Sequence, residues 1–139
     1  MKIRRASKRQ HKKILELAKL SSYTKDFGHF MFSGDKAYEN GWIRVLTKPG
    51  VGPIGFTCVR HKVRQPETSL YFIGIHPDHQ REGIGELFLK DLKEQSPNDR
   101  IILNVMKENT GAVNFYMKHG FTCVGDSLKG KGHQFTLEW

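Results

Sequence analysis

Residues 73–85 read Ile73-Gly74-Ile75-His76-Pro77-Asp78-His79-Gln80-Arg81-Glu82-Gly83-Ile84-Gly85 and mark a change from strand to helix. The apolar run that ends at Ile75 predicts a buried strand, and Gly83 to Gln95 carries apolar residues at helical spacing. Gly83 and Gly85 stand at the start of that helix, where glycine lets the backbone turn tightly and leaves its N–H groups uncovered. A helix N-terminus adds unbonded N–H donors and partial positive charge. The stretch therefore predicts a cradle for a phosphate or pyrophosphate group.

Two other phosphate-binding motifs do not fit this loop. A dinucleotide fingerprint requires a third glycine and a later acidic residue, but Phe88 and Val105 occupy those positions. A P-loop requires Gly-Lys-Ser/Thr, but Glu86 and Leu87 follow Gly85. A glycine-rich helix start without a ligand is the remaining alternative for the loop taken alone.

A second segment narrows the interpretation. Ile101 to Val105 is apolar and β-branched, which predicts a buried strand. It leads to Asn109-Thr110-Gly111-Ala112-Val113-Asn114-Phe115-Tyr116 and then to Gly120-Phe121. The residues between Gly85 and Asn109 leave room for one helix and one strand. Strand, helix and strand in this order predict a crossover between two parallel neighbours.

Both segments resemble motifs of the GNAT superfamily of N-acetyltransferases. Residues 80–85 are similar to its Gln/Arg-x-x-Gly-x-Gly/Ala loop, which cradles the pyrophosphate of coenzyme A. Residues 109–121 match its Asn-x-x-Ala-x-x-Phe-Tyr-x-x-x-Gly-Phe motif at every defining position. The resemblance runs clearly from Glu67 to Val124. It implies an α/β (α+β) fold with a mixed, mostly antiparallel central sheet of 6–7 strands, one splayed parallel pair and flanking helices.

The resemblance also implies an activity, which is direct transfer of acetyl from acetyl-coenzyme A to an amine. Tyr116 matches the catalytic general acid that protonates the departing thiolate, although a packed tyrosine with a satisfied hydroxyl is the alternative. The pantetheine arm is expected to pair with the strand backbone near Gly74, where a bulge would splay the sheet. The implied cofactor-binding residues are Ile73, Gly74, Ile75, Gln80, Arg81, Glu82, Gly83, Ile84, Gly85, Asn109 and Phe115.

The general base is where this chain departs from the family. The positions where relatives carry Glu hold Asn104 and Ser69, and the nearby substitutes are Glu67, His76 and Glu108. Catalysis through a water molecule, or without a base, is the other alternative. A weak base favours an acceptor amine of low pKa, because deprotonating lysine at pH 7 costs about 4.6 kcal/mol and an α-amine about 1 kcal/mol. The crowded segment from His76 to His79 lacks a fourth metal ligand, so no metal is expected.

Composition predicts one ordinary globular domain. The chain has 139 residues, so residues 1–139 are expected to form a single N-acetyltransferase domain. It shows no apolar run long enough to cross a membrane and no secretory signal, which predicts a cytoplasmic protein. Cys58 and Cys123 lie in apparent strands and are expected to be buried, reduced thiols.

Positive charge is concentrated at the N-terminus. The net charge is +9, and the first twenty residues hold eight Lys and Arg side chains against Glu16 alone. The cluster is interpreted as a solvated helix face or as a footprint for an acidic partner.

No nucleic-acid motif accompanies the basic cluster, so the favoured acceptor is a small-molecule or peptide amine, including an anionic one. Acetylation of aminoacyl-tRNA, as in GNAT-type toxins, and a non-catalytic coenzyme A-binding module remain alternatives. The chain is expected to be a monomer or a homodimer.

The remaining elements follow from periodicity and turn residues. Strands are expected at 1–6, 41–47, 53–63, 121–124 and 134–138, with a helix at 8–20. Residues 21–40 predict a short helix with loops. Their aromatic side chains are interpreted as a satellite core, as a wall of the acceptor site, or as both, and they are Tyr23, Phe27, Phe30, Phe32 and Tyr38.

Overall fold

The computed structural model describes residues 2–29, 34–62, 64 and 66–139. In the described part of the chain, seven strands form one sheet in the order β1-β2-β3-β4-β5-β7-β6. The strands are β1 Ile3–Arg5, β2 Ile43–Lys48, β3 Gly52–Lys62, β4 Glu67–Ile75, β5 Arg100–Met106, β6 Thr122–Ser127 and β7 Gly132–Glu138. The sheet is mostly antiparallel, and β4 and β5 form a parallel pair. This confirms the predicted mixed α/β sheet and the parallel relation of the strands on either side of the long helix.

Helices lie between β1 and β2, between β4 and β5, between β5 and β6, and between β6 and β7. They are η1 Lys8–Gln10, α1 His11–Ala18, η2 Lys25–His29, α2 Asp35–Glu39, η4 Pro77–His79, α3 Ile84–Gln95, α4 Thr110–Lys118 and η5 Leu128–Gly130. The helix predicted at 8–20 therefore begins as a 3-10 turn, which precedes α1. No helix in the described part of the chain is long and apolar enough to cross a membrane.

The chain divides into two compact units, which are described separately. Residues 1–59 and 72–95 form unit 1, and residues 60–71 and 96–139 form unit 2.

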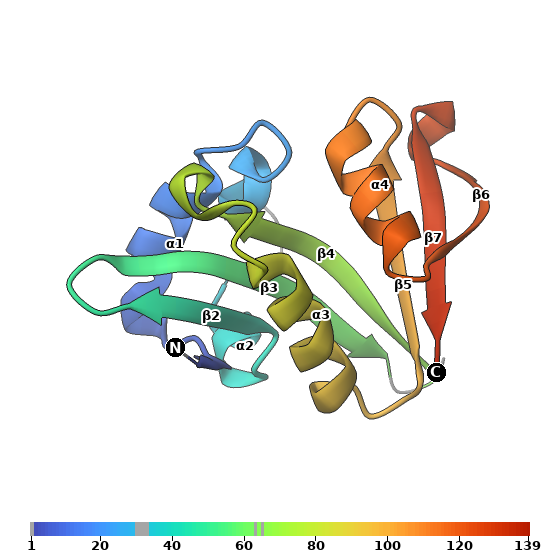
Figure 1. Cartoon of the computed structure of the whole chain (residues 1–139). Helices are drawn as coiled ribbons and strands as arrows, with labels where there is room; N and C mark the ends of the chain where they lie inside the picture. Colours follow the sequence, from blue (N-terminus) through green and yellow to red (C-terminus); the bar gives the residue numbers. More distant parts are fainter. Residues whose placement is uncertain (1, 30–33, 63, 65) are drawn as a thin grey trace. The chain divides into compact units, whose positions relative to one another are not determined.

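In unit 1, α1 and α3 cover opposite faces of β2 and β3 (Figure 1). Leu46, Ile54, Ile84 and Phe88 form the buried cluster that anchors α3 to the strands. A bidentate ion pair also joins β2 to α3, because Arg44 Nε and Nη2 lie 2.6 and 2.9 Å from the carboxylate oxygens of Asp91. These contacts hold the start of α3, and therefore the predicted phosphate loop, against the sheet.

The aromatic residues of 21–40 that the structure describes contribute mainly to the core. Phe27 is fully buried, with its ring centroid 5.0 Å from Phe56 and 5.6 Å from Phe72. Tyr38 is buried as well, whereas Tyr23 is exposed. Phe30 and Phe32 lie outside the described residues. The satellite-core interpretation therefore holds for Phe27 and Tyr38.

In unit 2, β7 pairs with β5 on one side and with β6 on the other. The parallel register between β4 and β5 joins Thr68–Leu70 to Ile101–Leu103, while β4 itself continues to Ile75. On α4, the buried ring of Tyr116 lies 5.2 Å from Phe121 and 6.3 Å from Phe135 of β7, measured between centroids. This packing fixes α4 against the sheet.

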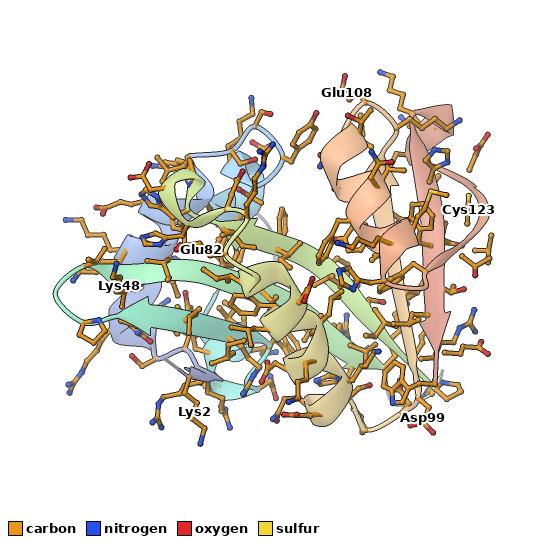
Figure 2. All side chains as sticks on the ribbon, viewed as in Figure 1. Lys2, Lys48, Glu82, Asp99, Glu108 and Cys123 are labelled. Carbon is orange, nitrogen blue, oxygen red and sulfur yellow. The ribbon has the colours of Figure 1, made fainter. Side chains whose placement is uncertain are left out.

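The two cysteines differ in exposure, which corrects the expectation that both are buried. Cys58 is fully buried in β3 and burial raises the pKa of its thiol to about 12. Cys123 is exposed and lies at the periphery of the sheet (Figure 2). The physical reason is that β6 is the last strand of the sheet and its residues Thr122–Asp126 are all exposed. Neither cysteine is in a disulfide.

Candidate active site

The loop between β4 and α3 has the backbone of an anion cradle. After the short η4 turn, Gln80 is extended, Arg81 has φ +65° and Gly83 has φ +79°. Alternation of negative and positive φ along a loop turns successive N–H groups toward the same side of the chain. The positive φ of Arg81 carries no sequence signal, because arginine normally avoids that region. The sequence therefore indicated the loop and both residues, but not the left-handed conformation of Arg81.

The start of α3 supplies the donors of this cradle. The first intrahelical hydrogen bond runs from Leu87 N to Gly83 O at 3.2 Å, so the N–H groups of Ile84 and Gly85 precede it. No atom lies within 4 Å of the position that a Cβ would take at Gly83. The space above this backbone is open, so a phosphate group could approach the donors closely. The loop therefore fits the pyrophosphate that the family motif implies.

Backbone and side-chain hydrogen bonds fasten the loop to β3 and to the end of β4. His76 N donates to Ile54 O at 2.8 Å, and Gln80 Nε2 donates to Ile75 O at 3.4 Å. His79 Nδ1 lies 3.0 Å from Glu82 Oε1, just before α3 (Figure 2). The Gln80 side chain is thus tied to the end of β4. The His79–Glu82 pair was not predicted, although its spacing of three residues could have indicated it.

The end of β4 is held by apolar packing on one face and by an aromatic ring on the other. Ile73 and Ile75 pack against the buried cluster that anchors α3. A Cβ at Gly74 would lie 2.5 Å from Phe56 Cε1, which is closer than any real contact. Glycine is therefore required here because the Phe56 ring lies against the backbone, a reason that differs from the expected bulge.

Unit 2 contains the second motif. Asn109 caps α4, since its Oδ1 accepts a hydrogen bond from Ala112 N at 3.4 Å. Tyr116 is 5% exposed, and burial raises the pKa of its phenol above the ordinary value of 10.0. The ring of Phe115 contacts His119 in a tilted arrangement, with 4.6 Å between centroids. Tyr116 therefore keeps its proton at neutral pH, which a general acid requires.

The proposed substitutes for a general base are mostly engaged elsewhere. The Glu67 carboxylate lies 3.2 Å from Lys62 Nζ and 3.9 Å from Arg100 Nη1. His76 Nδ1 accepts a hydrogen bond from Asp78 N, so a neutral ring carries its proton on Nε2 and offers no free lone pair. Glu108 remains, as an exposed residue just before α4 (Figure 2).

The predicted site residues thus fall into two groups. Residues 73–75 and 80–85 belong to one strand–loop–helix segment in unit 1. In unit 2, Phe115 and Tyr116 lie on α4, and Asn109 is its N-cap. Within the described residues, no group of three or more His, Cys, Asp or Glu side chains could hold a metal ion.

Comparison with known proteins identifies the family. The family model of the acetyltransferase (GNAT) family matches residues 8–121. The chain belongs to the GNAT family of acetyltransferases. A curated relative from Pseudomonas phage PaMx11, named 5-NmdU N-acetyltransferase, is 44% identical over 138 residues, which cover 99% of this chain and 98% of the relative. The predicted N-acetyltransferase activity, with acetyl-coenzyme A as the family's acetyl donor, is therefore confirmed at the level of the family.

Solved structures show the same fold. A GNAT-family acetyltransferase from Bacillus cereus superposes with a TM-score of 0.79 at 15% identity, covering 99% of this chain and 96% of that one. The PaiA N-acetyltransferase from Thermoplasma acidophilum, solved in complex with coenzyme A, gives a TM-score of 0.75 at 18% identity, covering 99% and 98% of the two chains. At these identities the likeness establishes the fold alone.

Proposed function

We propose that this GNAT enzyme acetylates the amine of a 5-substituted deoxyuridine, either 5-NmdU or a close analogue. The observation that carries the proposal is the 44% identity to the phage 5-NmdU N-acetyltransferase over nearly the whole of both chains. N-acetylation requires a nucleophilic nitrogen, so an amine on the modified base is the reacting group. This acceptor belongs to the predicted class of small-molecule amines. It differs from both the aminoacyl-tRNA and the non-catalytic alternatives.

Acetyl-coenzyme A would supply an acetyl group activated as a thioester. The N–H groups of Ile84 and Gly85, together with the backbone from Gln80 to Gly83, are the donors that we assign to its pyrophosphate. The open space above Gly83 and its positive φ support this assignment. Glu82 belongs to this loop through its pairing with His79. We assign the backbone of Ile73, Gly74 and Ile75 to the pantetheine arm, and Asn109 and Phe115 to further cofactor contacts.

Tyr116 is assigned as the catalytic acid. Its Oη releases a proton to the leaving sulfur, and the amine loses a proton as its bond to the acetyl carbon forms, so the protons balance. A thiol has a pKa near 8.5, and burial places the pKa of Tyr116 above 10.0. Transfer of the Tyr116 proton to the thiolate is therefore unfavourable by about 2 kcal/mol or more when no other proton moves. The proton of the amine must return to the phenolate for the transfer to proceed.

The domain assignment belongs to the same proposal. The matched family model, residues 8–121, includes parts of both compact units. We therefore treat residues 1–139 as one catalytic domain.

An acceptor panel tests the proposed function. The enzyme is incubated with acetyl-coenzyme A and with the 5-NmdU nucleoside, thymidine, spermidine or a lysine peptide, and products are identified by mass spectrometry. We expect one acetyl group on 5-NmdU and none on thymidine, which lacks the amine. Acetylation of spermidine or the peptide without acetylation of 5-NmdU would refute the acceptor assignment.

A further inference from the structure

A continuous set of exposed cations lies on unit 1, outside the predicted cofactor loop. Lys2 and Lys48 are visible near the start of β1 and at the β2–β3 turn (Figure 2). We call this set the basic N-terminal surface, and its members are Lys2, Arg4, Arg9, Lys12, Lys13 and Lys48. The set extends over a strand, a helix and a turn, so it is wider than a single solvated helix face.

Contacts within unit 1 join these elements into one surface. A pocket of about 430 Å³ is lined by Lys2, Arg4, Arg5, Gln10, Val45 and Thr47. Gln10 Nε2 donates to Thr47 Oγ1 at 3.4 Å, which links η1 to β2 at the wall of the pocket. The Lys13 side chain lies over the β2–β3 turn, with its Cδ 3.8 Å from the position of a Cβ at Gly52. The pocket therefore brings the cations of β1 beside η1 and β2, and Lys13 connects α1 with the start of β3.

The protein does not neutralise this charge itself. Lys8 is paired with Asp35 at 2.8 Å, and Arg5 donates to the backbone carbonyls of Tyr38 and Glu39. Among the described residues, no carboxylate lies within 4.0 Å of any cation of the basic N-terminal surface. Exposed charges of one sign repel one another, and an anionic partner relieves that repulsion.

We propose that the basic N-terminal surface binds the sugar–phosphate backbone of DNA, so that the acceptor base is acetylated within a polynucleotide. The inference rests on the proposed function, because the acceptor there is a deoxyuridine. A free nucleotide presents its phosphates at one point, whereas the surface spreads its cations over three elements. Phosphate contacts position a duplex without reading its sequence, which suits an enzyme that recognises a modified base.

Salt-dependent binding of unmodified DNA tests the surface independently of catalysis. We would measure fluorescence anisotropy with a labelled duplex lacking any amine-bearing base, without acetyl-coenzyme A, across a range of KCl concentrations. Each phosphate contact contributes about 0.9 to the slope of log affinity against log salt. A double variant, Lys2→Gln with Arg4→Gln, should lower the magnitude of that slope by up to about 2. A triple variant, Arg9→Gln with Lys12→Gln and Lys13→Gln, should lower it by up to about 3.

A matched control removes the same charge elsewhere. Lys118→Gln, Lys129→Gln and Lys131→Gln change exposed lysines of unit 2 and should leave the slope within error. Unchanged slopes in both test variants, or an equal loss in the control, would overturn the proposal. A wild-type affinity for DNA no greater than for thymidine triphosphate would also overturn it, as would weakened coenzyme A binding without weakened DNA binding. DNA binding without acetylation of 5-NmdU would instead refute the proposed function alone.

Discussion

Replacing Gly83 by valine should separate cofactor binding from fold stability. Gly83 has φ +79°, and the Cβ of a new side chain would have no other residue within 4 Å. The cost in the free protein is backbone strain, about 1–2 kcal/mol for an L-residue in the left-handed region. A typical domain has an unfolding free energy of about 5–15 kcal/mol, so the variant stays folded.

The loss of affinity for coenzyme A should be larger than backbone strain alone would cause. The valine side chain would fill the space through which a pyrophosphate approaches the donors at the start of α3. We expect the Kd for coenzyme A, measured by calorimetry, to rise at least tenfold, or about 1.4 kcal/mol.

Gly50 provides a matched control. Its φ is +78°, and no atom lies within 4 Å of its Cβ position, but it lies in the β2–β3 turn. Gly50→Val should lower the melting temperature by as much as Gly83→Val while leaving the Kd for coenzyme A unchanged. Equal Kd values for wild type and both variants would refute the placement of the pyrophosphate.

Three further predictions follow from the packing of single residues. Tyr116→Phe should lower turnover by roughly 10- to 1000-fold with little change in cofactor affinity, because only the hydroxyl is removed, and a wild-type rate would exclude Tyr116 as the acid. Gly74→Ala should destabilise the protein by about 1–3 kcal/mol in urea unfolding, because its Cβ would lie 2.5 Å from a buried ring. Gly111→Ala, in open space on α4, is the control, and equal stability of both variants would contradict the packing argument. In a thiol-reagent titration of the native protein, Cys123 should react rapidly and Cys58 only after unfolding, since burial raises the pKa of Cys58 to about 12. Equal reaction rates for the two thiols would refute this difference.

The identity of the general base does not follow from residue type alone. Glu67 is a reasonable candidate by type and position in the chain. In the fold it is paired with Lys62 and Arg100, and the latter comes from the following strand. His76 has the right chemistry, but its Nδ1 is used within its own turn. An amine of low pKa on the acceptor therefore remains the simplest way to dispense with a strong base.

The amino-acid sequence by itself determined the elements whose signals are local. The strand–loop–helix of residues 73–85 and the Asn109 cap depend on glycines, apolar spacing and a side chain near its own backbone. Such interactions form between residues a few positions apart, so a linear pattern reveals them. The two motifs also carried the resemblance to the family, and that resemblance implied the mixed sheet.

Only the tertiary structure decided properties that depend on distant partners. Cys123 is exposed because β6 is the last strand of the sheet, and strand order is set by pairing across the chain. Gly74 is required by the ring of Phe56 on a neighbouring strand, and the pocket that joins the cations of β1 to residues of β2 depends on the pairing of these two strands. These contacts join residues far apart in the sequence, where hydrophobic periodicity and turn chemistry carry no information about the partner.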